Sequence, residues 1–157
     1  MDLSTQYLGM TLKNPLVASS SPLTWELKSA LALQQAGVAA IIMPSLFEEQ
    51  ITHEQAKLQR FVFQQSIGHS ETDGFHPSMS LYQDHQYRYL SQIKLLKQQL
   101  EIPVIASLNG ISDGGWVQYA EELELAGADA LELNIYYIAA NPDESSEQVE
   151  QRYLHTF

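Results

Sequence analysis

The chain has 157 residues, 45% of them apolar, which suits one globular domain with a sizeable core. A formal net charge of -11 argues against nucleic acid and anionic membranes as partners, because both require clustered lysine and arginine. The absence of cysteine excludes disulfides and thiolate chemistry. The sequence begins without a signal-peptide pattern and has no apolar run near the roughly 20 residues of a membrane span. We therefore expect a cytoplasmic protein.

The first predicted elements are a small hairpin and a buried strand. Residues 4–12 alternate weakly between apolar and polar side chains around Gly9. The short apolar run near 16–19 is typical of a buried strand, and it opens into a loop of small residues, Ser19, Ser20 and Ser21. The carboxyl end of this strand is therefore expected to carry hydroxyl groups.

A helix and a second strand come next. Thr24 is the predicted N-cap, a stripe of leucine and alanine continues to Ala36, and Gly37 stands where a helix C-cap is expected. Residues 39–43 are all apolar and are followed by Pro44, a pattern that predicts a buried strand with a sharp end.

The middle of the chain is the least regular part. Apolar residues at roughly helical spacing predict one helix over 47–65 and a longer one over 82–100. Between them, 66–80 has no period and contains two glycines and a proline, so we expect a long loop of the kind that often carries function.

The segment 103–137 holds the clearest strand–helix–strand pattern. Apolar runs over 103–108 and 130–135 predict two strands, and an amphipathic helix that ends at Gly127 connects them. Because a helix-length crossover joins the two strands, they must be parallel. Polar residues that end such strands then share one rim of the sheet, where α/β proteins place ligands.

The pattern repeats along the chain. The segment 36–42 (AGVAAII) matches 126–132 (AGADALE), and each is a helix end followed directly by a strand. A last helix is expected to begin within 143–146 and to continue to Phe157. The fold class is therefore α/β, with four βα units, or half of a TIM barrel, in a single domain over 1–157. Half a barrel would expose two strand edges, so it should continue in a longer protein, form a homodimer through those edges, or adopt an open sheet.

Other kinds of site are less well supported by the sequence. The five histidines make no metal-binding pair with a carboxylate at helical spacing, although His69 and His76 share a loop with Glu71 and Asp73, where a surface metal site stays open. The segment 112–115 (SDGG) could cradle an anion at a helix start, but Asp113 opposes this and N-capping is favoured. We therefore assign no metal site.

Four segments resemble the N-terminal half of class 1 dihydroorotate dehydrogenases and of the dihydroorotate dehydrogenase-like branch. They are 14–19 (NPLVAS), 43–50 (MPSLFEEQ), 103–110 (PVIASLNG) and 126–134 (AGADALELN). The resemblance covers nearly the whole chain, loosely in its middle. It implies a TIM barrel, FMN at the carboxyl rim, and a CH–CH oxidation of a small substrate in pyrimidine biosynthesis.

The resemblance also implies roles for individual residues. Ser19 and Ser20 fall where the first loop approaches the flavin, and Ser45 falls where the second does. Asn109 corresponds to the flavin-facing end of the third strand, and Asn134 to an asparagine that contacts both flavin and substrate. Short polar side chains on rigid strand ends suit the donors and acceptors of an isoalloxazine ring. The alternative is that these residues only terminate strands and cap helices.

The sequence departs from the family at two catalytic positions. Where the family has a lysine that reaches cofactor and substrate, this chain has Pro44, and Tyr137 stands at the position of the catalytic cysteine or serine base. A phenol with an ordinary pKa near 10 is a poor base at neutral pH. No catalytic residue is therefore assigned, and we expect the chain alone to bind flavin weakly.

Two function classes remain open at this point. One is an FMN-dependent oxidoreductase of which this chain is the N-terminal half. The other is a non-catalytic, self-associating half-barrel or a truncation product.

Overall fold

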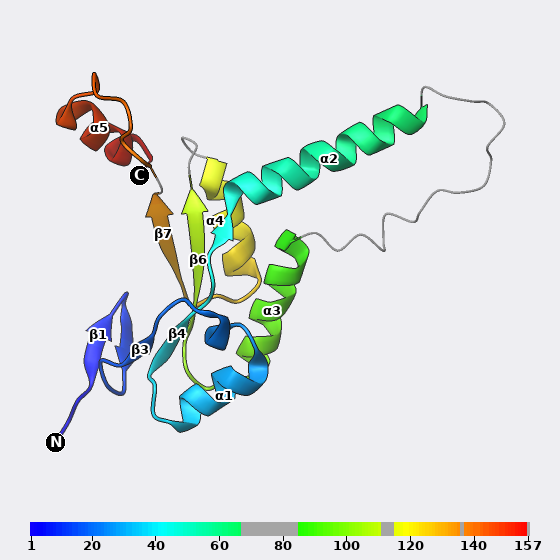
Figure 1. The fold of residues 1–157 in the computed structure, drawn as a ribbon. Coiled ribbons are helices and arrows are strands. Elements are labelled where there is room, and N and C mark those ends of the chain that lie inside the picture. Colours follow the sequence, from blue (N-terminus) through cyan, green and yellow to red (C-terminus); the bar gives the residue numbers. More distant parts are fainter. Residues whose placement is uncertain (67–84, 111–114, 136, 157) are drawn as a thin grey trace.

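Parallel strands with helices on one side dominate the structure (Figure 1). The computed structural model describes residues 1–66, 85–110, 115–135 and 137–156. The predicted loop over 66–80, the start of the helix predicted from Tyr82 and the possible anion cradle at 112–115 lie wholly or mostly outside these residues.

The four predicted strands are present and parallel. In spatial order they are β3 (Val17–Ala18), β4 (Ala40–Ile42), β6 (Val104–Gly110) and β7 (Ala130–Ile135). Spatial order thus follows sequence order, because each strand is followed by a crossover that returns the chain to the same end of the sheet. The prediction of an α/β fold with a parallel sheet is confirmed.

A fifth strand, which the sequence did not indicate, comes from a break at Pro44. β4 pairs with the start of β6, and the two-residue strand β5 (Leu46–Phe47) pairs with its end. The pairing of β4 with β6 reaches the Met43 N–H, which donates to the Ile105 carbonyl at 2.9 Å, and it is interrupted at Pro44, which follows directly. The expected strand end at Pro44 is therefore a gap in one bent strand.

The buried tyrosine Tyr89 fills this gap from the helical side. Its hydroxyl accepts a hydrogen bond from the Ser107 N–H at 3.1 Å and donates one to the Ser107 carbonyl at 3.3 Å. These are the backbone groups of β6 that lie opposite the break. Because the phenol is only 4% exposed, burial raises the pKa of Tyr89 well above its ordinary value.

Helices follow the strands largely as predicted. They are α1 (Leu27–Gln35), α2 (Glu48–Ser66), α3 (His85–Gln99), α4 (Gly115–Leu125) and α5 (Ser146–Thr156). Gly37 and Gly127 follow α1 and α4 with φ of 99° and 102°, a backbone conformation that favours glycine and ends a helix. In the described ranges, no helix is both long and apolar enough to cross a bilayer.

The predicted N-cap at Thr24 is wrong. Thr24 ends a 3₁₀ turn, Pro22–Thr24, and its buried hydroxyl donates to the Ser21 carbonyl at 2.8 Å. Helix α1 starts later, with Glu26 at its N-cap position. Pro22 begins an earlier turn because its fixed φ suits the first position of a helical turn.

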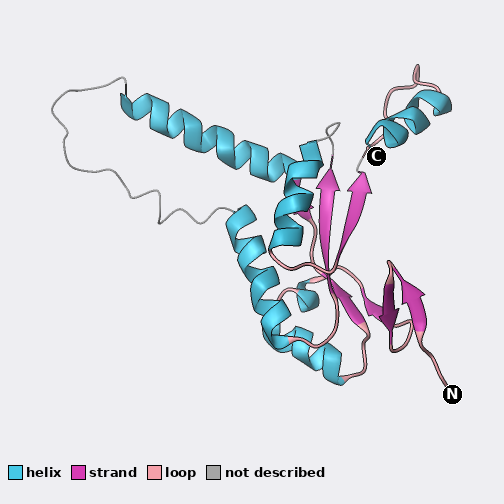
Figure 2. Cartoon of the chain, turned by 180° about the vertical axis from the view of Figure 1, so that it is seen from behind, coloured by secondary structure: helices cyan, strands magenta, loops and turns pink. Residues whose placement is uncertain are grey.

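The N-terminal hairpin is confirmed. Strands β1 (Thr5–Tyr7) and β2 (Met10–Leu12) are antiparallel, and the two turn residues, Leu8 and Gly9, both have positive φ. This turn geometry matches the twist of a two-stranded ribbon. The hairpin lies on the side of the sheet away from α1, α3 and α4 (Figure 2).

Two apolar clusters occupy the two faces of the sheet. The larger lies under the helices and includes Ile41, Met43, Val104, Ala106 and Leu108. The smaller lies on the opposite face, which we call the open face, and consists of Leu12 from the hairpin with Ala39, Ala40, Ile42 and Ile105. The hairpin thus covers the open face only where the strands begin.

Candidate functional site

The open face changes from apolar to polar along the strands. Ile105 and Ala130 form one register pair near the start of β6 and β7 and pack with the hairpin cluster. The next pairs on the same face are Ser107 with Glu132 and Asn109 with Asn134. Side chains two residues apart in a strand share a face, so four polar groups line its carboxyl half.

Residues Ser45 and Phe47 extend this polar region across the sheet. Phe47 is the register partner of Asn109 in β5, so its ring lies on the open face, where it is 39% exposed. The Ser45 hydroxyl contacts the Ser107 hydroxyl at 2.8 Å and is therefore on this face too. The resulting polar rim comprises Ser45, Phe47, Ser107, Asn109, Glu132 and Asn134.

A chain of hydrogen bonds fixes the direction of the serine hydroxyls. Ser107 donates to the Glu132 carboxylate at 2.9 Å, so its single proton is used. In the contact between the two serines, Ser45 must then be the donor. While Glu132 is ionised, Ser45 can offer only its lone pairs to a ligand, and it suits an N–H or O–H donor.

The two asparagines form the second link across the strands. Asn134 donates from its side-chain amide to the Asn109 side-chain oxygen at 3.0 Å. Asn109 is buried at 6% exposure, whereas Asn134 is exposed. The buried amide therefore orients the exposed one, which is available to a ligand.

The five residues predicted to contact the cofactor are brought together only in part. Ser45, Asn109 and Asn134 share the polar rim. Ser19 and Ser20 follow β3 at the same end of the sheet and are exposed, but no hydrogen bond within the described residues joins them to the other three.

Sequence reasoning missed three members of the polar rim. Ser107 sits inside an apolar run, Glu132 inside another, and Phe47 was expected to begin a helix. The available signal was alternation, because Ser107 and Asn109, like Glu132 and Asn134, are two residues apart. Only the register between strands shows that all of them meet on one face.

Tyr137, which the sequence resemblance places at the position of a catalytic base, is committed to another contact. Its hydroxyl donates to the Glu144 carboxylate, and Arg152 lies over its ring at 4.4 Å while forming an ion pair with Glu144. The hydrogen bond to Glu144 raises the pKa of Tyr137. This arrangement opposes proton abstraction by the phenol and instead holds α5 against the end of β7.

No cluster suited to a metal ion is found in the part of the chain that the structure describes. The possible site of His69, His76, Glu71 and Asp73 lies outside that part.

Comparison with known proteins gives one informative similarity. No protein-family model matches the sequence. A curated protein of Aeropyrum pernix, provisionally named dihydroorotate dehydrogenase A (fumarate), is 31% identical over 137 residues. The match covers 85% of this chain and 41% of that protein, so the chain spans less than half of the relative's length. This similarity supports a dihydroorotate dehydrogenase-like relationship.

Proposed function

We propose that the chain supplies the N-terminal half of an FMN-dependent oxidoreductase of the class 1 dihydroorotate dehydrogenase-like type. Its polar rim would hold the flavin ring, and its reaction would be the CH–CH oxidation of a small substrate in pyrimidine biosynthesis. The observation that carries the proposal is the alignment of Ser45, Asn109 and Asn134 on one face at the carboxyl ends of adjacent parallel strands. The similarity to the Aeropyrum pernix relative supports the same reading.

The residues of the polar rim fit the ring part of FMN. Asn134 offers an exposed amide, Ser45 offers acceptor lone pairs, and the half-exposed Phe47 offers an apolar surface to a planar group. When bound, the flavin supplies a hydride acceptor. The six rim residues include no lysine or arginine, so the phosphate would be held elsewhere, as in TIM barrels whose phosphate site follows the seventh and eighth strands.

In the proposed barrel, the open face would form part of the inner face. In a TIM barrel, side chains of the inner face fill the interior, and ligands lie at the carboxyl ends of the strands. The apolar cluster at the start of the open face and the polar rim at its end match this division. The hairpin would close the amino-terminal end of the barrel.

The isolated chain is proposed to be inactive. Pro44 replaces the lysine of the family, and Tyr137 is occupied by Glu144, so neither position provides a proton acceptor. The chain alone also supplies four of the strand positions of an eight-stranded barrel. Its part in the reaction is to position the ring and the substrate.

A complementation experiment tests the proposal. The chain is titrated with FMN alone and after co-expression with the part of the Aeropyrum pernix relative outside the matched segment. We expect weak flavin binding alone and a yellow, stoichiometric complex after co-expression.

Asn134→Ala should weaken flavin binding about 2- to 10-fold, the value of one hydrogen bond. Gln99→Ala, exposed at the opposite end of the sheet, is the matched control. A tight complex with the chain alone refutes the inactive-half proposal, and equal effects of the two substitutions refute the site.

A second candidate is a non-catalytic half-barrel that forms a homodimer. The sheet order leaves β7 at one edge and β3 and β5 at the other, and α4 exposes Val117 and Leu125, which are 45% and 84% accessible. Unpaired strand edges readily pair with another chain. Light scattering distinguishes the two candidates: a stable dimer that binds no flavin after co-expression favours the homodimer.

A further inference from the structure

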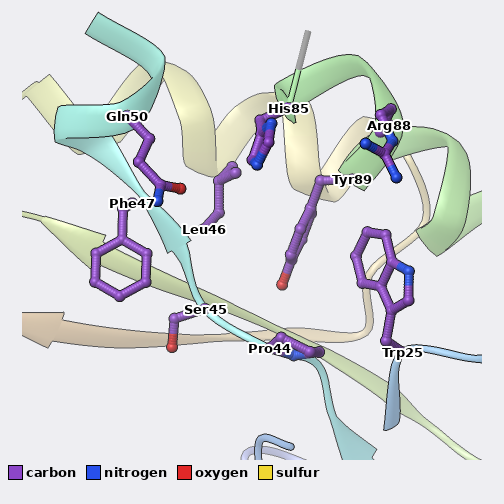
Figure 3. Close-up of a pocket in the computed structure, with 9 residues that line it drawn as sticks. All are labelled: Trp25, Pro44, Ser45, Leu46, Phe47, Gln50, His85, Arg88 and Tyr89. Carbon is purple, nitrogen blue, oxygen red and sulfur yellow. The ribbon is translucent and has the colours of Figure 1, made fainter. Parts of the chain in front are cut away.

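A separate cavity lies on the helical side of the bent β4–β5 segment. It has a volume of about 250 Å³, is open to solvent on one side, and is lined by residues 44–47, Trp25, and the first turns of α2 and α3 (Figure 3). Leu46 in its wall belongs to the cluster beneath the helices. Two rim residues, Ser45 and Phe47, also border it, but in Figure 3 the Ser45 hydroxyl and the Phe47 ring point away from Trp25 and Arg88. The cavity is therefore distinct from the polar rim.

Aromatic rings form one wall of the cavity. Trp25 and Tyr89 lie with ring centroids 5.7 Å apart and planes tilted by 47°. Gln92 donates from its side chain to the Trp25 carbonyl at 2.7 Å, which ties this residue to α3. The Tyr89 hydroxyl is also held by Ser107, and Trp25 packs against the cluster beneath the helices, so both rings are in place before any ligand arrives. A fixed aromatic wall suits a planar guest.

Two basic side chains line the cavity, His85 and Arg88, and only one of them has an acidic partner among the described residues. His85 is engaged by Glu54, with its ring nitrogen at 3.2 Å and its backbone N–H at 3.1 Å from the carboxylate oxygens. Arg88, one turn later on α3, also lines the cavity. Among the described residues no acidic side chain pairs with Arg88, although the chain carries a net charge of -11. The guanidinium is thus available to an anion.

We propose that this cavity binds a small aromatic carboxylate with a single ring. The ring would lie against Trp25 and Tyr89, and the carboxylate would accept paired hydrogen bonds from Arg88, whose planar fork matches its geometry. The volume is near the lower limit of roughly 300 Å³ for ligand pockets, which favours one ring over a flavin. The proposal does not depend on flavin binding.

Titration with benzoate and with benzamide, its neutral isostere, tests the proposal on the whole chain. Amide NMR or calorimetry should show saturable benzoate binding, with benzamide at least tenfold weaker because it lacks the charge that Arg88 recognises. Arg88→Gln should reduce benzoate affinity to that of benzamide. Arg60→Gln removes the same charge from an exposed position on α2 and should leave the affinity unchanged.

Three outcomes would overturn the proposal. They are no saturation below about 10 mM benzoate, equal affinity for benzoate and benzamide, or the same loss in Arg60→Gln as in Arg88→Gln. Arg88→Lys provides a second variant that keeps the charge and removes the fork. It should bind benzoate more weakly than the parent and more tightly than Arg88→Gln, with an unchanged circular dichroism spectrum.

Discussion

Replacement of Tyr89 by phenylalanine isolates the energetic role of the hydroxyl at the Pro44 gap. The substitution removes one oxygen and leaves the Ser107 N–H and carbonyl without the partner they have at 3.1 and 3.3 Å. Both groups are buried, and an unsatisfied buried polar group costs about 1–3 kcal/mol. Since one of the two can relax, we expect a total loss of about 2–3 kcal/mol. For a domain of this size that lowers Tm by roughly 5–10 °C.

Urea denaturation followed by circular dichroism measures this loss, with Tyr7→Phe as the control at a tyrosine that is 41% exposed. The pH dependence adds a second readout. Burial raises the pKa of folded Tyr89, so the folded state holds this proton more tightly than the unfolded state. The associated stability is present below the ordinary tyrosine pKa and is lost as pH rises above about 10. Tyr89→Phe should therefore lose less stability above pH 10 than the parent. A cost within about 0.5 kcal/mol of Tyr7→Phe would show that the hydroxyl does not complete the sheet.

Three further predictions concern the supports of the sheet. Asp129→Ala should lower the free energy of unfolding by about 1–2 kcal/mol, because the carboxylate accepts the first N–H of β6 at 2.8 Å. Lys97→Met should lower it by under about 1 kcal/mol, since it removes only a partly exposed ion pair. Urea denaturation compares the two variants. Tyr137→Phe should raise the lowered pKa of Glu144 toward its ordinary value, which carboxyl NMR measures. The variant should also lose less stability than the parent as pH falls through the carboxylate range. An unchanged pKa of Glu144 would contradict the contact. Gly37→Ala should cost about 1–2 kcal/mol in thermal unfolding through backbone strain alone, because φ is 99° and an added Cβ would meet no atom within 4 Å.

Local patterns in the sequence were sufficient to predict the parallel strands and the hairpin. The short apolar runs near 39–43 and 103–108 are typical of buried strands, and Gly37 and Gly127 mark helix ends by a conformation that other residues rarely adopt. These signals act within a few residues, so they survive without knowledge of the tertiary structure.

Features that depend on pairing between distant segments could not be predicted. The split at Pro44 is stabilised by Tyr89, which is 45 positions away and supplies hydrogen bonds that the proline region does not. Alternation with Asn109 was not enough to identify Ser107 as a site residue, because its partners Ser45 and Glu132 come from two distant segments of the chain. Near Thr24 the sequence carries two local signals, a helix cap at Thr24 and a turn that begins at Pro22, and the structure contains the turn.

Substitutions have different consequences at the apolar start and at the polar end of the open face. Substitutions at Ile42 or Ile105 alter the packing beneath the hairpin and endanger folding. Substitutions at Ser45 or Asn134 change the polar rim and its hydrogen bonds to Ser107 and Asn109, since neither side chain belongs to a buried apolar cluster. At the proposed flavin site, exchange of a few short side chains would therefore change the ligand preference while the apolar packing beneath the hairpin remains the same.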